Sequence, residues 1–236
     1  MNDHNTTGTT LSSEGRFCLL AAAFAASWGM MQLFLVKQVP LDLTWLGLGL
    51  TSFVFAEFLF ALTYPITDVV TEVWGARRAR LVVYGGMVVN LLVMMLLTLA
   101  IALPAPEYWA PQNEAYTLLY EGAPRLWVAS ITAVFISQIL DIYVFNIIRG
   151  VTGDRLLWLR NNGSTLVSQG VDTVIFYGIA FYGAVPTDAF VSLLVGNYLL
   201  KVLLAALDTP MVYLLVRWAR QPDQQTTLAQ AAGERA

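Results

Sequence analysis

The hydrophobic positions of this chain fall into long runs that are separated by short polar segments. A helix needs about 20 apolar residues to cross a hydrocarbon layer of roughly 30 Å. Six runs have the required length, at residues 17–36, 43–67, 81–103, 126–148, 164–185 and 190–218. The pattern predicts an all-α, polytopic membrane protein, with six transmembrane helices in one domain over residues 16–218.

The segments outside this domain are polar. Residues 1–15 and 219–236 lack hydrophobic periodicity, so we expect two disordered tails. Residues 104–124 combine Glu with Tyr and Trp, a mixture typical of membrane interfaces, and we expect a surface loop there. Pro65 is expected to bend or end the last turn of the second helix. The sixth helix is long enough to tilt, or to break at Pro210.

Composition agrees with a membrane location and excludes several classes of protein. The chain is 57% apolar and 12% charged, with a net charge of -3 and a mean hydropathy of +0.62. An acidic chain without a dominant Lys and Arg cluster is not a nucleic-acid binder. One cysteine, Cys18, excludes an internal disulfide framework, and one histidine, His4, excludes His-based metal or acid–base chemistry. We therefore expect no metal, no cofactor and no enzyme activity.

The basic residues predict the orientation in the membrane. Ten of the thirteen Lys and Arg residues fall on one side of the predicted spans. Short cytoplasmic loops retain positive charge, so this side is predicted to be cytoplasmic. Both termini lie on it, as an even number of spans requires.

Two of the runs share a polar motif. Residues 137–145 and 168–176 both read S-Q-x-x-D-x-x-[VI]-F, 31 residues apart. On a helix, the Ser, Gln and Asp of each motif project to one face, with the Phe beside them. Such groups can join membrane helices by hydrogen bonds, or they can line a site. We favour a site, because a central Asp is penalised by roughly 2.5 to 3.5 kcal/mol on insertion scales.

Acids outnumber bases inside the predicted spans. Glu57, Asp141, Asp172 and Asp208 are accompanied by one base, Lys201. Protonation, a basic partner, or a bound cation or donor-rich ligand can each satisfy a buried acid. Lys201 lies well inside the sixth run, so we predict an ion pair with Asp141 or Asp172 on another helix. Glu57 shares a helical stripe with aromatic side chains, which we interpret as packing.

A polar segment after Pro65 carries a family resemblance. Residues 65–80, PITDVVTEVWGARRAR, resemble the D-x-x-T-E-x-[YFW]-G-x-[KR]-R-A-R fingerprint of the queuosine precursor transporters, also called the vitamin uptake transporter family. The later motifs around Asp141, Asp172 and Lys201 follow in that family's order. The resemblance spans about residues 17–218 and implies a fold similar to the substrate-binding subunits of energy-coupling-factor transporters. It implies import of 7-cyano-7-deazaguanine or 7-aminomethyl-7-deazaguanine across the cell inner membrane, for tRNA queuosine salvage.

The residue chemistry agrees with such a ligand. A deazaguanine presents N1–H and an exocyclic amine together, and a carboxylate can accept both. Its ring can stack on aromatic side chains, and an aminomethyl cation matches the excess of acids. The predicted substrate-binding residues are Asp141, Asp172, Gln138, Gln169, Lys201, Phe145, Phe176 and Asn197, with Phe53 as a further ring. A gate or structural latch is predicted from Asp68, Thr71 and Glu72.

Two alternatives concern assembly. The chain could be the substrate-binding subunit of an ATP-driven transporter, which docks an ATPase through the alanine-rich face of the first span, formed by Ala21, Ala22, Ala25 and Ala26. A homodimer is a further alternative. We favour a solitary transporter in the lipid bilayer, and a stable ATPase partner on purification would count against it.

Overall fold

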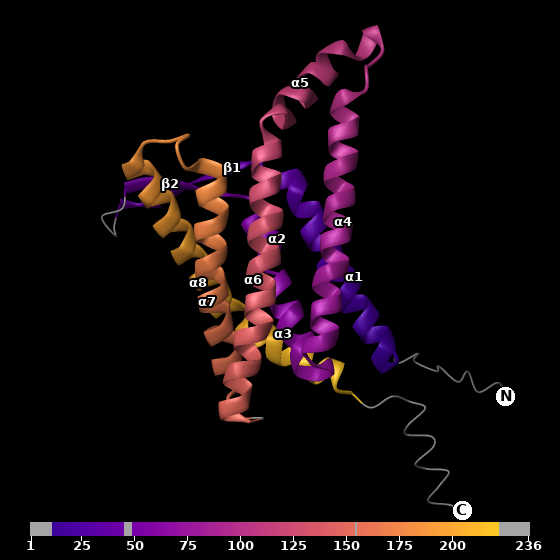
Figure 1. The fold of residues 1–236 in the computed structure, drawn as a ribbon, viewed down its shortest axis with the longest axis vertical. Coiled ribbons are helices and arrows are strands. Elements are labelled where there is room, and N and C mark those ends of the chain that lie inside the picture. Colours follow the sequence, from indigo (N-terminus) through magenta and orange to yellow (C-terminus); the bar gives the residue numbers. More distant parts are fainter. Residues whose placement is uncertain (1–10, 45–48, 154, 222–236) are drawn as a thin grey trace, which may run out of the picture.

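The computed structural model describes residues 11–44, 49–153 and 155–221, and it is a helical bundle with one β-hairpin at its side (Figure 1). The helices are α1 (Ser13–Phe34), α2 (Glu57–Phe60), α3 (Thr63–Trp74), α4 (Ala76–Ala102), α5 (Ala110–Glu121), α6 (Ala123–Thr152), α7 (Leu157–Phe181) and α8 (Thr187–Ala219), with a 3-10 turn η2 (Glu107–Trp109). The strands are β1 (Gln38–Leu43) and β2 (Gly49–Val54).

Helices α1, α4, α6 and α8 are long and apolar enough to cross a membrane. They correspond to the first, third, fourth and sixth predicted spans, and α7 corresponds to the fifth. Helix α1 begins at Ser13, inside the segment predicted as a tail, because the Ser12 hydroxyl accepts the Gly15 N–H at 3.1 Å and caps the helix. Helix α8 continues through Pro210. The prediction of six crossings goes beyond these four helices and stays a prediction.

The prediction of a helix over residues 43–67 is wrong for the first half of that range. Strand β2 and the last residue of β1 fall in that half, and the two strands pair in an antiparallel register that sets Asp42 opposite Leu50. Asp42 Oδ1 accepts the backbone N–H and the hydroxyl of Thr44, at 2.9 and 2.6 Å, in a local arrangement that favours a turn over a helix. Pro40 and the glycines of this segment also disfavour a helix.

Two helices, α2 and α3, replace the remainder of that span. Pro65 is the third residue of α3, in a turn whose N–H groups have no intrahelical partner. The proline is therefore tolerated at the start of a helix, and the expectation that it ends one is wrong. As a consequence, the polar segment after Pro65 is helical and buried inside the bundle.

The segment between the third and fourth spans is helical, not a loop. Turn η2 and helix α5 connect α4 to α6, and none of their residues is buried. Pro111 lies in the first turn of α5, the helical position that proline favours. The expected surface location is confirmed, whereas the expected loop conformation is wrong.

Helix α3 lies inside the bundle and contacts α1, α4, α6 and α8, while α6 packs along α7 and α7 along α8. Helices α1 and α4 pack closely at Gly86, where a Cβ atom would lie 2.5 Å from the Phe24 ring. The outward side of α4 is apolar, with Leu81, Val88, Leu92, Met95 and Leu99 exposed, as a face toward lipid requires.

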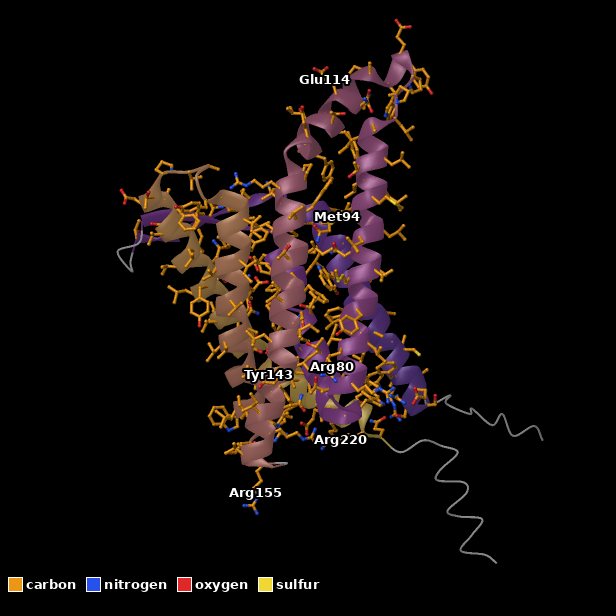
Figure 2. The ribbon with its side chains drawn as sticks, in the orientation of Figure 1. Arg80, Met94, Glu114, Tyr143, Arg155 and Arg220 are labelled. Carbon is orange, nitrogen blue, oxygen red and sulfur yellow. The ribbon has the colours of Figure 1, made fainter. Side chains whose placement is uncertain are left out.

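The start of α1 and the end of α8 meet at one end of the bundle. The Arg16 guanidinium donates to the carbonyls of Trp218 and Gln221, at 3.1 and 2.6 Å. Arg80, Arg155 and Arg220 lie toward this same end, opposite Glu114 (Figure 2). The bundle therefore has an arginine-rich end, which is the end predicted to be cytoplasmic.

Candidate functional site

A cavity lies between α1, the end of β2, α2, α6, α7 and α8. The cavity is small in this conformation, with a free volume of about 20 Å³, which is room for one or two water molecules. Its walls are mainly apolar, and its charged groups are Glu57, Asp172 and Lys201. The other lining residues are Met31, Leu35, Val54, Ala56, Phe60, Ser130, Val134 and Phe176. A largely apolar pocket with a few convergent polar groups is the usual form of a small-molecule site.

The cavity contains one ammonium that two carboxylates share. Lys201 Nζ lies 2.5 Å from Asp172 Oδ2 and 3.4 Å from Glu57 Oε2. The exposed fractions are 2% for Lys201, 2% for Asp172 and 6% for Glu57. The ammonium also lies 4.3 Å from the centre of the Phe60 ring, within the range of a cation–π contact. The predicted ion pair between Lys201 and an acid of another helix is confirmed, and its partner is Asp172.

The sequence alone predicts that Glu57 belongs to a packing stripe. The structure places Glu57 in the cavity. The helix is interrupted between α2 and α3, and as a result α2 lies against α1. The signal that could have identified Glu57 was the excess of acids over Lys201. One base can serve two carboxylates only when all three side chains meet, and sequence spacing does not report such a meeting.

Asp172 is held by a chain of hydroxyl groups. The Tyr64 hydroxyl donates to Ser137 Oγ at 2.8 Å, and Ser137 Oγ donates to Asp172 Oδ1 at 3.2 Å. These contacts connect α3, α6 and α7 inside the bundle. One oxygen of Asp172 thus accepts from Ser137 and the other from Lys201, which fixes the orientation of the carboxylate.

The two copies of the repeated motif bind each other. Ser137 of the first copy donates to Asp172 of the second, and Ser168 of the second copy donates to Asp141 of the first at 2.8 Å. Because α6 and α7 run antiparallel, the same Ser and Asp spacing gives two reciprocal bonds. The motif therefore joins helices, and in addition its second copy places Asp172 in the cavity. Asp141 is fully buried outside the lining.

The remaining predicted residues have other surroundings. Gln138 donates to Thr63 Oγ1 and accepts from Thr67 Oγ1, each at 2.9 Å, and so ties α6 to α3. Asn197 donates to the Ser52 carbonyl at 3.0 Å and so ties α8 to the hairpin. Phe176 lines the cavity. Phe53, Phe145 and Gln169 are buried, and none of them lines it.

The predicted latch residues separate into two groups. Glu72 binds Arg160 at 2.9 Å and Arg220 at 2.7 Å, with Arg149 at 3.8 Å, in a cluster at the arginine-rich end. Thr71 donates to a carbonyl of its own helix. Asp68 takes no part in the arginine cluster, and its buried carboxyl lies against that of Asp141.

Comparisons with known proteins identify the family. Residues 55–215 match the family described as "Putative vitamin uptake transporter". The "Probable queuosine precursor transporter" of Bacillus subtilis is 34% identical over 70% of this chain and 72% of its own length. The "Queuosine precursor transporter" of Escherichia coli is 28% identical over 71% of this chain and 72% of its own. No solved structure matches this chain.

The family match covers most of α2 to α8, including the cavity residues Glu57, Asp172 and Lys201. Together with four helices of membrane-spanning length, it marks a multi-pass membrane transporter and not an enzyme. This chain belongs to the vitamin uptake transporter family.

Proposed function

We propose that this chain imports a queuosine precursor across the cell inner membrane and that the cavity around Lys201 is the substrate site. The names of the B. subtilis and E. coli relatives support this substrate class. The observation that carries the assignment is the buried group of Glu57, Asp172 and Lys201 in a cavity that Phe60 and Phe176 also line. The substrates would be 7-cyano-7-deazaguanine, 7-aminomethyl-7-deazaguanine, or both.

The chemistry of this cavity suits a 7-deazaguanine. Two carboxylates share one ammonium, so one acid equivalent is left to accept the N1–H and exocyclic amine of the base. Phe176 and Phe60 offer faces for the planar ring. The surplus negative charge also suits an aminomethyl cation. Asp172 and Glu57 are then the base-reading acids, and Asp141, Gln138 and Gln169 support the helices around them.

The proposal includes six crossings with the arginine-rich end in the cytoplasm. Helix α7 and the segment from α2 to α3 would complete the four long helices. Along α1, a rise of 1.5 Å per residue separates Arg16 from the cavity residue Met31 by about 22 Å. The cavity would therefore lie in the outer half of the bundle, where a substrate from outside can reach it.

Uptake of the two labelled deazaguanines tests the proposal. Cells that cannot synthesise either precursor would be compared with and without this chain. We expect accumulation only with the chain, reduced about ten-fold or more by Asp172→Asn, because a hydrogen bond to a charged group contributes roughly 1.5 to 3 kcal/mol. Glu107→Gln, an exposed change in η2, is the control. Accumulation of neither compound at normal protein level would overturn the proposal.

An ATP-driven assembly is the competing function. On α1, Ala22 and Ala26 are exposed, so their small side chains leave a face on which another helix could pack closely. Purification in mild detergent distinguishes the two functions. A solitary transporter elutes alone or as a homodimer, whereas a substrate-binding subunit retains a stoichiometric ATPase partner.

A further inference from the structure

A second group of acids lies between the cavity and the arginine-rich end. Asp68 of α3 is 1% exposed and Asp141 of α6 is fully buried, and their carboxyls lie against each other. Asp208 of α8 lies near Asp141, and Asn161 of α7 directs its amide toward Asp208. Ser168 donates to Asp141 Oδ1 at 2.8 Å. Four helices therefore direct polar side chains to one interior place.

This group has fewer hydrogen-bond donors than acceptors. Among the described residues, no partner reaches either oxygen of Asp68, Asp141 Oδ2 or Asp208 Oδ1. Asn161 is 2% exposed, and its side-chain oxygen also has no donor within the described ranges. Every one of these atoms is an acceptor. Unpaired buried acceptors are costly, and two facing carboxylates cannot both stay ionised, so the missing ligand is a donor that fits between carboxyl oxygens.

The basic side chains nearby are engaged elsewhere. Lys201 serves Asp172 and Glu57, and Arg160 and Arg220 serve Glu72, which lies one turn from Asp68 on α3. Arg149 also lies near Glu72, Arg16 donates to carbonyls at the end of α8, and Arg78 of α4 pairs with Glu14. In the part of the chain that the structure describes, no Lys or Arg nitrogen lies within 4.0 Å of the Asp68 or Asp141 carboxyl.

A metal ion is less suitable than a proton as the missing ligand. Within the described residues, no three or more His, Cys, Asp or Glu side chains are arranged to hold a metal. A proton needs only two oxygens at hydrogen-bond distance. On Asp68 it turns one acceptor into an O–H donor toward Asp141 Oδ2, and it removes one of the two opposed charges.

The acid pair is connected to the substrate cavity. Asp141 lies one helical turn from Ser137, whose hydroxyl donates to Asp172 in the cavity. Ser168, which donates to Asp141, lies one turn from Asp172 on α7. Asp141 and Asp172 are therefore connected by two hydrogen bonds between the same pair of helices, α6 and α7. A shift of α6 against α7 that alters one bond has to alter the other.

We propose that Asp68 and Asp141 share a proton and that this chain couples import of its substrate to proton entry at this pair. The inference rests on the proposed function. One proton would bind between the two carboxyls from the outer side, accompany one substrate molecule, and leave on the cytoplasmic side, so that proton and charge are conserved over the cycle. A pH gradient would then be the energy source.

The shared proton has a readout that needs no substrate. A carboxylic acid has an infrared C=O stretching band that a carboxylate lacks. We expect the full-length protein in nanodiscs at neutral pH to show this band from buried groups, and Asp68→Asn or Asp141→Asn to remove the part of its intensity that the pair contributes. Asp172→Asn is the matched control, because Asp172 already has a basic partner in Lys201. A band that loses no intensity in either variant, folded and at full amount, overturns the shared proton.

The coupling is tested in proteoliposomes with the uncharged 7-cyano-7-deazaguanine. With one proton per substrate, an inward gradient of one pH unit drives about ten-fold accumulation. We expect Asp68→Asn to lose this accumulation yet keep exchange of labelled for unlabelled substrate, and exposed Asp188→Asn to behave as wild type. Accumulation that ignores the gradient, or that Asp68→Asn retains, overturns the coupling. Absence of both accumulation and exchange in the wild type instead overturns the proposed function. In that case the infrared band still tests whether Asp68 and Asp141 share a proton.

Discussion

Replacing Lys201 by Met removes the one base among the described residues that line the cavity, while keeping much of the side-chain volume. Met has an unbranched apolar side chain, so the packing against Phe60 and Phe176 is largely retained. What changes is the charge. Asp172 and Glu57 would be left buried together with no cation, where the wild-type ammonium lies 2.5 and 3.4 Å away.

The expected loss is large because both acids are buried. Breaking a buried ion pair by removing one partner destabilises a protein by about 3 to 5 kcal/mol. For a chain of this size, about 2 to 4 °C of melting temperature correspond to each kcal/mol. We therefore expect Lys201→Met to lower Tm by about 6 to 20 °C. Adding Asp172→Asn removes one uncompensated charge and is expected to restore part of this loss.

Thermal unfolding of the purified protein in detergent measures the effect. Lys37→Met is the matched control, because Lys37 is exposed and surface changes usually stay within about 0.5 kcal/mol. Partial rescue of Tm by the double variant is the diagnostic result. If Lys201→Met caused only a packing defect, its loss of stability would add to the loss caused by Asp172→Asn. If Lys201→Met alone is as stable and as active as wild type, the assignment of the cavity as a charged site is refuted.

Three further predictions address the bundle. Gly86→Ala is expected to cost about 1 to 3 kcal/mol in thermal unfolding, because its methyl group overlaps an α1 ring, whereas Gly85→Ala, with open space around it, should be neutral. Glu72→Gln should destabilise by about 3 to 5 kcal/mol, because it leaves several guanidinium groups without their acid. Reporter fusions at Gln112 and Arg155 should lie outside and in the cytoplasm, respectively, and two cytoplasmic signals would reverse the assignment of α4 and α6.

The long helices and the need of Lys201 for a partner follow from the amino-acid sequence alone. Hydrophobic length is a local property, so α1, α4, α6 and α8 follow from runs of apolar residues whatever lies beside them. The desolvation of a buried ammonium is equally independent of the fold, which is why an acid on another helix could be predicted. Local preference was insufficient at residues 43–67, where apolar strands and an apolar helix have similar composition.

Which acid meets which partner depends on how the helices pack against one another. The two copies of S-Q-x-x-D have the same local spacing, yet Asp172 reaches Lys201 and Asp141 reaches Asp68, because the packing of α6 and α7 against α3 and α8 gives each copy different neighbours. Glu57 lines the cavity because the helix is interrupted between α2 and α3. The stripe of aromatic residues around Glu57 does not predict this interruption. Pairing energies depend on distances of a few ångströms between helices, and those distances arise only when the bundle is packed.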